Sequence, residues 1–232
     1  MFQRYIITMP LYLLLIAKCH TNASQHQKSV RSLESFLNKF VKMVQEEMHE
    51  RLNTSMYHLQ MPDHLDSVSG RRIQLGKDRL ARIFGLSFKF GRNGNCERYI
   101  KNGKNTLRCP VKFDDLLIQL PLLDNEETVY VAHVTVKGAL DFRQDRNGTT
   151  FHQFILLNQQ YEMRNSNGKP VNPPPAAYCL KAKSPSGLKA VLQKRLQDLI
   201  VKGEFKDAVL SSLKRMRKAK DMSGSKTSIT FI

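Results

Sequence analysis

The chain has 232 residues, of which 41% are hydrophobic and 25% charged, so it is long enough to bury a core and has the composition of a folded protein. Thirty-seven basic residues against 20 acidic ones give a net charge of +17. The basic excess lies in two blocks, residues 71–104 and 186–220, a pattern that fits phosphate, sulfate or anionic lipid groups but equally fits a solvated surface.

The first residues indicate entry into the secretory route. Arg4 precedes an apolar run over residues 6–17 that is too short to span a bilayer, and no later segment qualifies. We expect a signal peptide over residues 1–23, with cleavage after residue 17, 19 or 23 left open. The protein is then secreted and extracellular, without stable membrane insertion and with nucleic acid excluded as a partner. The acceptor triplets at Asn53 and Asn147 predict glycosylation.

Residues 29–52 form the first predicted helix. Its apolar residues recur at spacings of three and four, which places them on one helix face: Leu33, Leu37, Phe40, Val44, Met48 and Leu52. Residues 56–61 extend this pattern, and we expect Pro62 to end it.

Residues 72–183 change to the alternating period of strands. Leu86, Phe88 and Phe90 alternate, and long apolar segments cover residues 111–123, 129–142 and 149–163. A turn at Asn147-Gly148 joins the last two of these segments, and residues 176–183 are predicted to form a final short strand. Strands of this length favour a strongly bent antiparallel sheet.

Asn102-Gly103 is a strong two-residue hairpin signal, and it makes a disulfide prediction possible. Partners across such a turn have residue numbers that sum to 205, as Cys96 and Cys109 do, and the alternation of pair types makes them a close, non-hydrogen-bonded pair. We therefore expect a disulfide there. Zinc binding is the rival, but no second close cysteine pair or histidine cluster accompanies it. Cys179 is either free or bonded to Cys19.

A second amphipathic helical region covers residues 187–219. Its apolar stripe shifts phase near Gly203, which predicts a kink or two helices in series, and its opposite face is basic. The tail over residues 221–232 is polar. The predicted fold is α+β, a single domain over residues 24–220 in which a long, curved antiparallel sheet wraps around the N- and C-terminal helices.

Two short segments resemble a known family. Met61-Pro62-Asp63-His64-Leu65-Asp66, after the first helix, and Val136-Lys137-Gly138-Ala139-Leu140-Asp141, in a central strand, are similar to segments of the arthropod group 7 mite allergens. Through them the chain resembles the tubular lipid-binding superfamily, which includes juvenile-hormone-binding and bactericidal permeability-increasing proteins. The resemblance implies a super-roll of sheet about a long helix, a hydrophobic pocket and non-enzymatic lipid binding. Bactericidal relatives bind lipopolysaccharide through basic tips.

Catalytic patterns are not found in the sequence. His49-Glu50 lacks the second histidine of a zinc-protease helix, and no Gly-x-Ser-x-Gly occurs. His133 and His152 do not face each other if partners across the Asn147-Gly148 turn sum to 295. We expect no enzymatic activity, no cofactor and no metal.

Two binding hypotheses follow, and they are compatible. In the first, apolar side chains line a site for a lipid or other amphipathic molecule, although the same residues would also suit an ordinary filled core. The predicted lining residues are Leu33, Leu37, Phe40, Val44, Phe88, Val134, Val136, Leu192, Leu196, Leu199, Phe205, Val209 and Leu213. In the second, anionic glycans or lipopolysaccharide bind a basic surface that includes Arg71, Arg72, Lys214, Arg215, Arg217 and Lys218. A cystatin-like protease inhibitor is a third alternative, which leaves the long final helix unexplained.

Overall fold

The computed structural model describes residues 33–51, 56–76, 78–123, 128–145, 148–171 and 175–222. The predicted signal peptide, both predicted glycosylation sites (Asn53 and Asn147), Cys19 and the end of the tail lie outside the described residues. Among the described helices, none is long and apolar enough to cross a bilayer.

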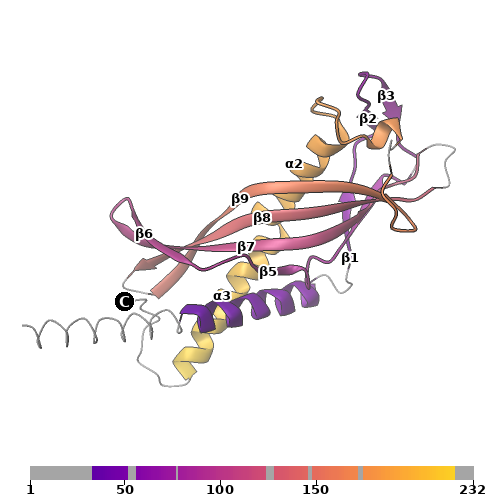
Figure 1. Ribbon diagram of the computed structural model, residues 1–232. Coiled ribbons are helices and arrows are strands. Elements are labelled where there is room, and N and C mark those ends of the chain that lie inside the picture. The colour runs from indigo at the N-terminus through magenta and orange to yellow at the C-terminus, as the bar shows by residue number, and fades with distance from the viewer. Residues whose placement is uncertain are drawn as a thin grey trace, which may run out of the picture.

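The fold is α+β and is dominated by a long antiparallel sheet of seven strands that does not close into a barrel (Figure 1). Its strands follow the order β1-β4-β7-β8-β9, and the short strands β5 and β6 also pair with β7. Strands β2 and β3 form a separate small sheet. The strand bounds are β1 (Met56–Gln60), β2 (His64–Asp66), β3 (Arg72–Gln74), β4 (Leu80–Phe84), β5 (Phe90–Arg92), β6 (Glu97–Lys101), β7 (Lys104–Gln119), β8 (Tyr130–Asp145) and β9 (Gly148–Asn165).

Three long strands form the body of the sheet. β7 and β8 have 16 residues each and β9 has 18, as the long apolar segments of the sequence predict. Val134 and Val136 of β8 are fully buried on the face that carries the core, and so are their even-numbered successors Leu140 and Phe142. The even-numbered side chains of β8 thus face the core, while Ala139 and Asp141 are buried on the other face.

The β8–β9 register corrects the predicted turn. Asp145 pairs with Gly148, so cross-strand numbers sum to 293 beside the turn, and the predicted sum of 295 is reached only at Lys137 with Asn158 and beyond. Two register shifts account for the difference, because β9 has one more residue than β8 at each. His133 pairs with Glu162, so His133 and His152 are not opposite each other.

The β6–β7 hairpin has the predicted register. Asn102 and Gly103 have φ values of 53° and 70°, which suits the tight turn, and Lys101 pairs with Lys104. Glu97 then pairs with Arg108, so the next pair outward is Cys96 and Cys109, whose α-carbons are 4.2 Å apart and whose sulfurs are bonded. The predicted disulfide is present, and it lies on the core side of the hairpin because Cys109 is fully buried.

Helices occupy both ends of the described chain. Residues 33–51 form the N-terminal helix, and α2 (Leu188–Val201) and α3 (Glu204–Met222) follow each other with a break at Gly203, as the phase shift predicts. Phe36 and Phe40 pack edge-on against Phe142, at centroid distances of 6.3 and 5.4 Å. Phe205 of α3 packs against Phe113 at 5.0 Å. Phe113 pairs with Val136, so both helices contact the core face of the sheet.

Three segments differ from the sequence prediction. Residues 56–60 form β1, because they pair with β4, a distant partner that helical periodicity does not reveal. Residues 176–183 contain a 3-10 turn, η1 (Ala176–Tyr178), in place of a strand. Residues 85–89 form a turn, because Gly85 has a φ of +99° and its carbonyl accepts from the Lys89 N–H at 2.7 Å. The alternation predicted through Phe88 is therefore wrong.

Candidate functional site

The predicted lining residues converge on one apolar interior. Twelve of the thirteen are buried and belong to a single hydrophobic cluster that also contains Phe113, Phe142 and Phe154. Phe88 is the exception: it is 59% exposed, because the turn at Gly85 directs it outward. The N-terminal helix, the sheet and both C-terminal helices thus contribute to a common interior.

Ion pairs fix how the N-terminal helix lies beside α3. Arg215 Nη1 is 3.4 Å from Glu47 Oε2, and Arg51 Nη1 is 4.0 Å from Glu204 Oε2, so the C-terminal part of the N-terminal helix lies beside α3. Glu47 is nearly buried. Burial acts to raise the pKa of Glu47, but hydrogen bonds from Ser211, Arg51 and Arg215 outweigh it and hold that pKa below its usual value.

Two polar side chains interrupt the apolar inner face of β9. Gln159 and Tyr161 pair with Val136 and Val134, so they lie on the core side of the strand. The Tyr161 hydroxyl donates to Gln159 Oε1, while Gln159 Nε2 has no hydrogen-bond partner among the described residues. Sequence reasoning missed this pair, because isolated polar residues in a strand more often face solvent.

A second polar group that sequence reasoning missed lies on the opposite face of the sheet. The Asp141 side chain is fully buried and accepts from Arg108 Nε at 2.8 Å and Arg108 Nη2 at 3.0 Å. Tyr99 Oη and Gln153 Nε2 also donate to it, both at 3.0 Å. Because its members come from β6, β7, β8 and β9, this cluster ties the hairpin to the sheet.

The predicted anion-binding residues do not form one surface. Arg71 and Arg72 are exposed beside the small β2–β3 sheet, whereas Lys214, Arg215, Arg217 and Lys218 follow α3 toward the other end of the molecule (Figure 1). Two of the α3 residues also have protein partners, since Arg215 pairs with Glu47 and Arg217 donates to the Thr149 carbonyl. Lys214 and Lys218 are exposed and make no ion pair with another described residue.

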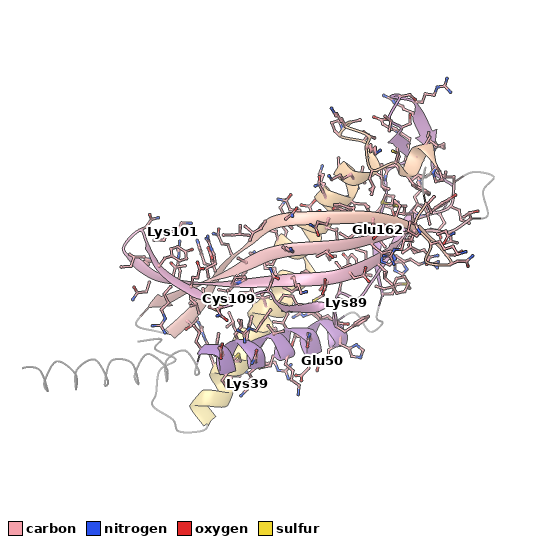
Figure 2. All side chains as sticks on the ribbon, viewed as in Figure 1. Lys39, Glu50, Lys89, Lys101, Cys109 and Glu162 are labelled. Carbon is pink, nitrogen blue, oxygen red and sulfur yellow. A yellow bond between two sulfur atoms is a disulfide. The ribbon has the colours of Figure 1, made fainter. Side chains whose placement is uncertain are left out.

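Charged side chains are distributed over the outside of the molecule. In Figure 2, Lys39 and Glu50 point away from the sheet on the outer side of the N-terminal helix, and both are exposed. Lys101 and Glu162 lie at opposite ends of the sheet. Cationic groups are thus available at several places on the surface, while the interior beneath them is apolar.

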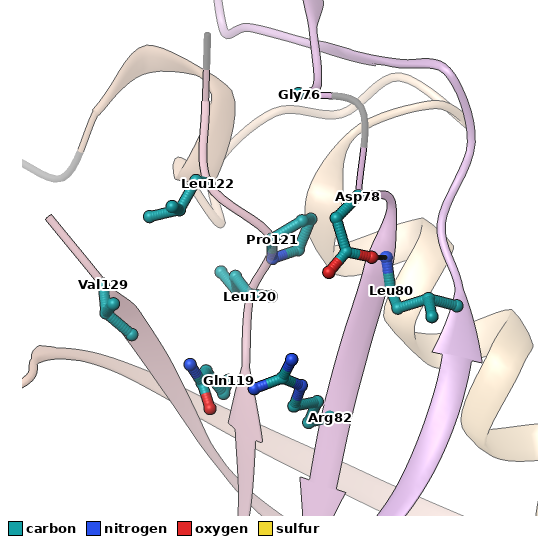
Figure 3. Close-up of a pocket in the computed structure, with 9 residues that line it drawn as sticks. All are labelled: Gly76, Asp78, Leu80, Arg82, Gln119, Leu120, Pro121, Leu122 and Val129. Atoms are coloured by element: carbon teal, nitrogen blue, oxygen red, sulfur yellow. Dashed lines mark hydrogen bonds between the residues drawn. The ribbon is translucent and has the colours of Figure 1, made fainter. Parts of the chain in front are cut away.

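A pocket of about 290 Å³ opens at the rim of the sheet, between the start of β4 and the end of β7 (Figure 3). Leu80 and Leu122 provide apolar walls, and the Arg82 guanidinium lies beside Gln119. Asp78 accepts a hydrogen bond from the Leu80 N–H at 3.3 Å. None of the predicted lining residues lines this pocket, and its volume is at the lower limit for a small-molecule site.

His133 of β8 and His152 of β9 both have hydrogen-bond partners. His133 Nδ1 is 2.6 Å from Asp115 Oδ1, and His152 Nε2 is 2.8 Å from Arg143 Nη2. Burial, together with the charges of Arg143 and neighbouring lysines, lowers the pKa of His152. Within the described part of the chain, no group of three or more His, Cys, Asp or Glu side chains is arranged to hold a metal.

No protein-family model matches the chain, and no characterised protein matches it at a significant level. The geometry of the site is that of an apolar interior between sheet and helices, with the buried Gln159 and the half-buried Tyr161 on the last strand of the sheet.

Proposed function

We propose that the chain is a secreted, non-enzymatic binding protein for a lipid or other amphipathic hydrophobic molecule. The ligand lies between the helices and the sheet, which curls around them as a super-roll of the tubular lipid-binding type. The observation that carries this proposal is the single apolar cluster shared by the N-terminal helix, β7, β8, α2 and α3. An interior that runs along two helices suits a chain-like ligand better than a compact one.

A ligand could reach this interior at the open edge of the sheet. β9 is the last strand in the sheet order, and α2 and α3 pack against it. The ligand enters where these helices meet β9, because the helices can move apart from a sheet edge without breaking a strand pairing. The resemblance to mite group 7 allergens agrees with the same ligand class.

Binding of a fluorescent apolar probe tests this proposal. N-phenyl-1-naphthylamine, titrated into the purified, delipidated protein, should show saturable fluorescence enhancement at one site, and long-chain amphiphiles should displace it. A linear, non-saturable signal like that of an unrelated basic protein would contradict the proposal. The same titration with Phe88→Ser is the matched control, because Phe88 is exposed and lies outside the apolar cluster.

A second function, binding of anionic glycans or lipopolysaccharide, is favoured by one observation. Lys214 and Lys218 are one helical turn apart on α3, are exposed, and pair with no described carboxylate. Their positive charges could bind phosphate or sulfate groups next to the apolar interior. One amphipathic ligand could use both sites, because its apolar part would lie in the interior while its anionic group stayed at the surface.

A further inference from the structure

The inner face of β9 contains a donor that the fold leaves unused. Gln159 is 8% exposed, and its Nε2 has no acceptor among the described residues. A buried N–H without an acceptor loses its hydrogen bonds to water and gains nothing in return. Across the sheet Gln159 pairs with Val136, and along the strand its nearest neighbour on the same face is Tyr161, followed by the buried Met163.

The orientation of the Gln159 amide follows from Tyr161. The Tyr161 hydroxyl donates to Oε1, which leaves Nε2 as the free donor. Burial raises the pKa of Tyr161, so this hydroxyl is protonated at physiological pH and can donate to Oε1. In this arrangement the N–H groups of the amide are directed away from Tyr161.

The position of Gln159 matches the proposed ligand site. Phe113, Val136 and Gln159 form one row across β7, β8 and β9, and Phe113 packs against Phe205 in the first turn of α3. Gln159 thus lies in the row that meets the α2–α3 junction, on the strand against which both helices pack.

The charges near this position restrict the ligand. Within the described part of the chain, no Lys, Arg or His is buried. The buried carboxylates are Glu47 and Asp141, and both have basic partners of their own. An anionic group placed beside Gln159 would lose its hydration without meeting a cation, whereas a neutral oxygen would gain a donor.

We propose that Gln159 is the polar anchor of the interior site and donates its Nε2–H to the oxygen of an uncharged amphiphile, such as a long-chain ketone, ester or alcohol. This inference rests on the proposed function and adds the chemical class of the ligand. The hydrocarbon part lies among the apolar residues of the cluster, and the single oxygen lies in the Phe113–Gln159 row.

The test compares chain-matched ligands by displacement of N-phenyl-1-naphthylamine from the full secreted protein. The wild type should bind 2-tridecanone about tenfold more tightly than tridecane, the factor expected for one hydrogen bond in an apolar site. Dodecanoate should bind more weakly than the ketone. In Gln159→Leu the preference for the ketone should fall to about unity. Gln160→Leu, at the exposed neighbouring position, should retain it.

Gln159→Met provides a second variant of similar length, and melting curves establish that each variant is folded. Equal affinities of the wild type for ketone and alkane, a preference that survives in both Gln159 variants, or tighter binding of dodecanoate would overturn the assignment of Gln159 while leaving apolar binding intact. If the probe itself shows no saturable binding, the proposed function is contradicted, and so is the role of Gln159, which depends on it.

Discussion

A buried aspartate connects the β6–β7 hairpin to the sheet. Replacing Asp141 with Asn should lower the free energy of unfolding at neutral pH by about 2–3 kcal/mol, because Arg108 loses its charged partner. The cost stays in this range because the Arg108 side chain is 37% exposed and can be hydrated. Denaturant unfolding measures it. Asp114→Asn is the control, since the Asp114–Lys112 pair is more exposed and should contribute under about 1 kcal/mol.

The stabilising effect of Asp141 should depend on pH. Burial acts to raise the pKa of Asp141, but hydrogen bonds from Arg108, Gln153 and Tyr99 outweigh it and lower that pKa below the ordinary 3.8. A carboxyl with a lowered pKa stabilises the fold above its unfolded-state pKa, and the effect is lost as pH falls through the folded-state pKa. The stability difference between wild type and Asp141→Asn should therefore be constant near neutral pH and shrink below about pH 4. A difference unchanged in acid would contradict this account.

Gly138 allows two neighbouring residues to approach β8. A Cβ at this position would overlap the ring of Phe154 and lie 2.8 Å from the Ile155 carbonyl oxygen. Gly138→Ala should therefore destabilise the protein by about 1–3 kcal/mol through overpacking. Gly91→Ala in β5 is the matched control, because a Cβ at residue 91 would have no other atom within 4 Å among the described residues. Equal melting temperatures for the two variants would count against the observed packing of Phe154.

At the scale of elements, the disulfide should be a main support of the hairpin. Replacing both Cys96 and Cys109 with Ala removes a disulfide between residues that are 13 positions apart in the sequence. This should lower the free energy of unfolding by about 3 kcal/mol. Reduction of the wild type should give a similar loss in denaturant titrations. Cys179→Ala is the control, because Cys179 forms no disulfide among the described residues. Loss of stability only in the Cys179 variant would contradict the pairing.

The exposed lysines of α3 should contribute to binding of sulfated polymers. Lys214→Ser with Lys218→Ser should make the protein elute from heparin at lower salt, because contacts with sulfate groups are screened by ions. Arg71→Ser with Arg72→Ser removes the same charge beside the β2–β3 sheet and should change elution less. Equal shifts in both double variants would indicate retention by net charge alone.

Local signals predicted some elements well and missed those that depend on distant partners. Asn102-Gly103 determined the turn and register of the β6–β7 hairpin, and through them the cysteine pairing. β1 was missed, because only its pairing with β4 makes residues 56–60 a strand. The apolar interior was predicted from periodicity, but Gln159 was not, since its burial depends on the helices that pack against β9.

At the scale of the whole molecule, the proposed function depends on the space shared by the two helical regions and the sheet. The interior is largely apolar, and its buried polar atoms without a hydrogen-bond partner among the described residues include Gln159 Nε2 on β9 and Ser212 Oγ on α3. A molecule with a hydrocarbon chain and one neutral oxygen would complement both features. Ordinary core residues would explain the apolar cluster equally well but would leave the unpaired donor of Gln159 without a purpose.

Native mass spectrometry of the protein purified from secreting cells tests the central claim most directly. We expect a population heavier than the bare chain by the mass of one apolar molecule. Organic extraction should remove this mass, and added 2-tridecanone should restore a one-to-one complex. A spectrum with only the bare chain, together with no uptake of 2-tridecanone after extraction, would contradict lipid binding in the interior.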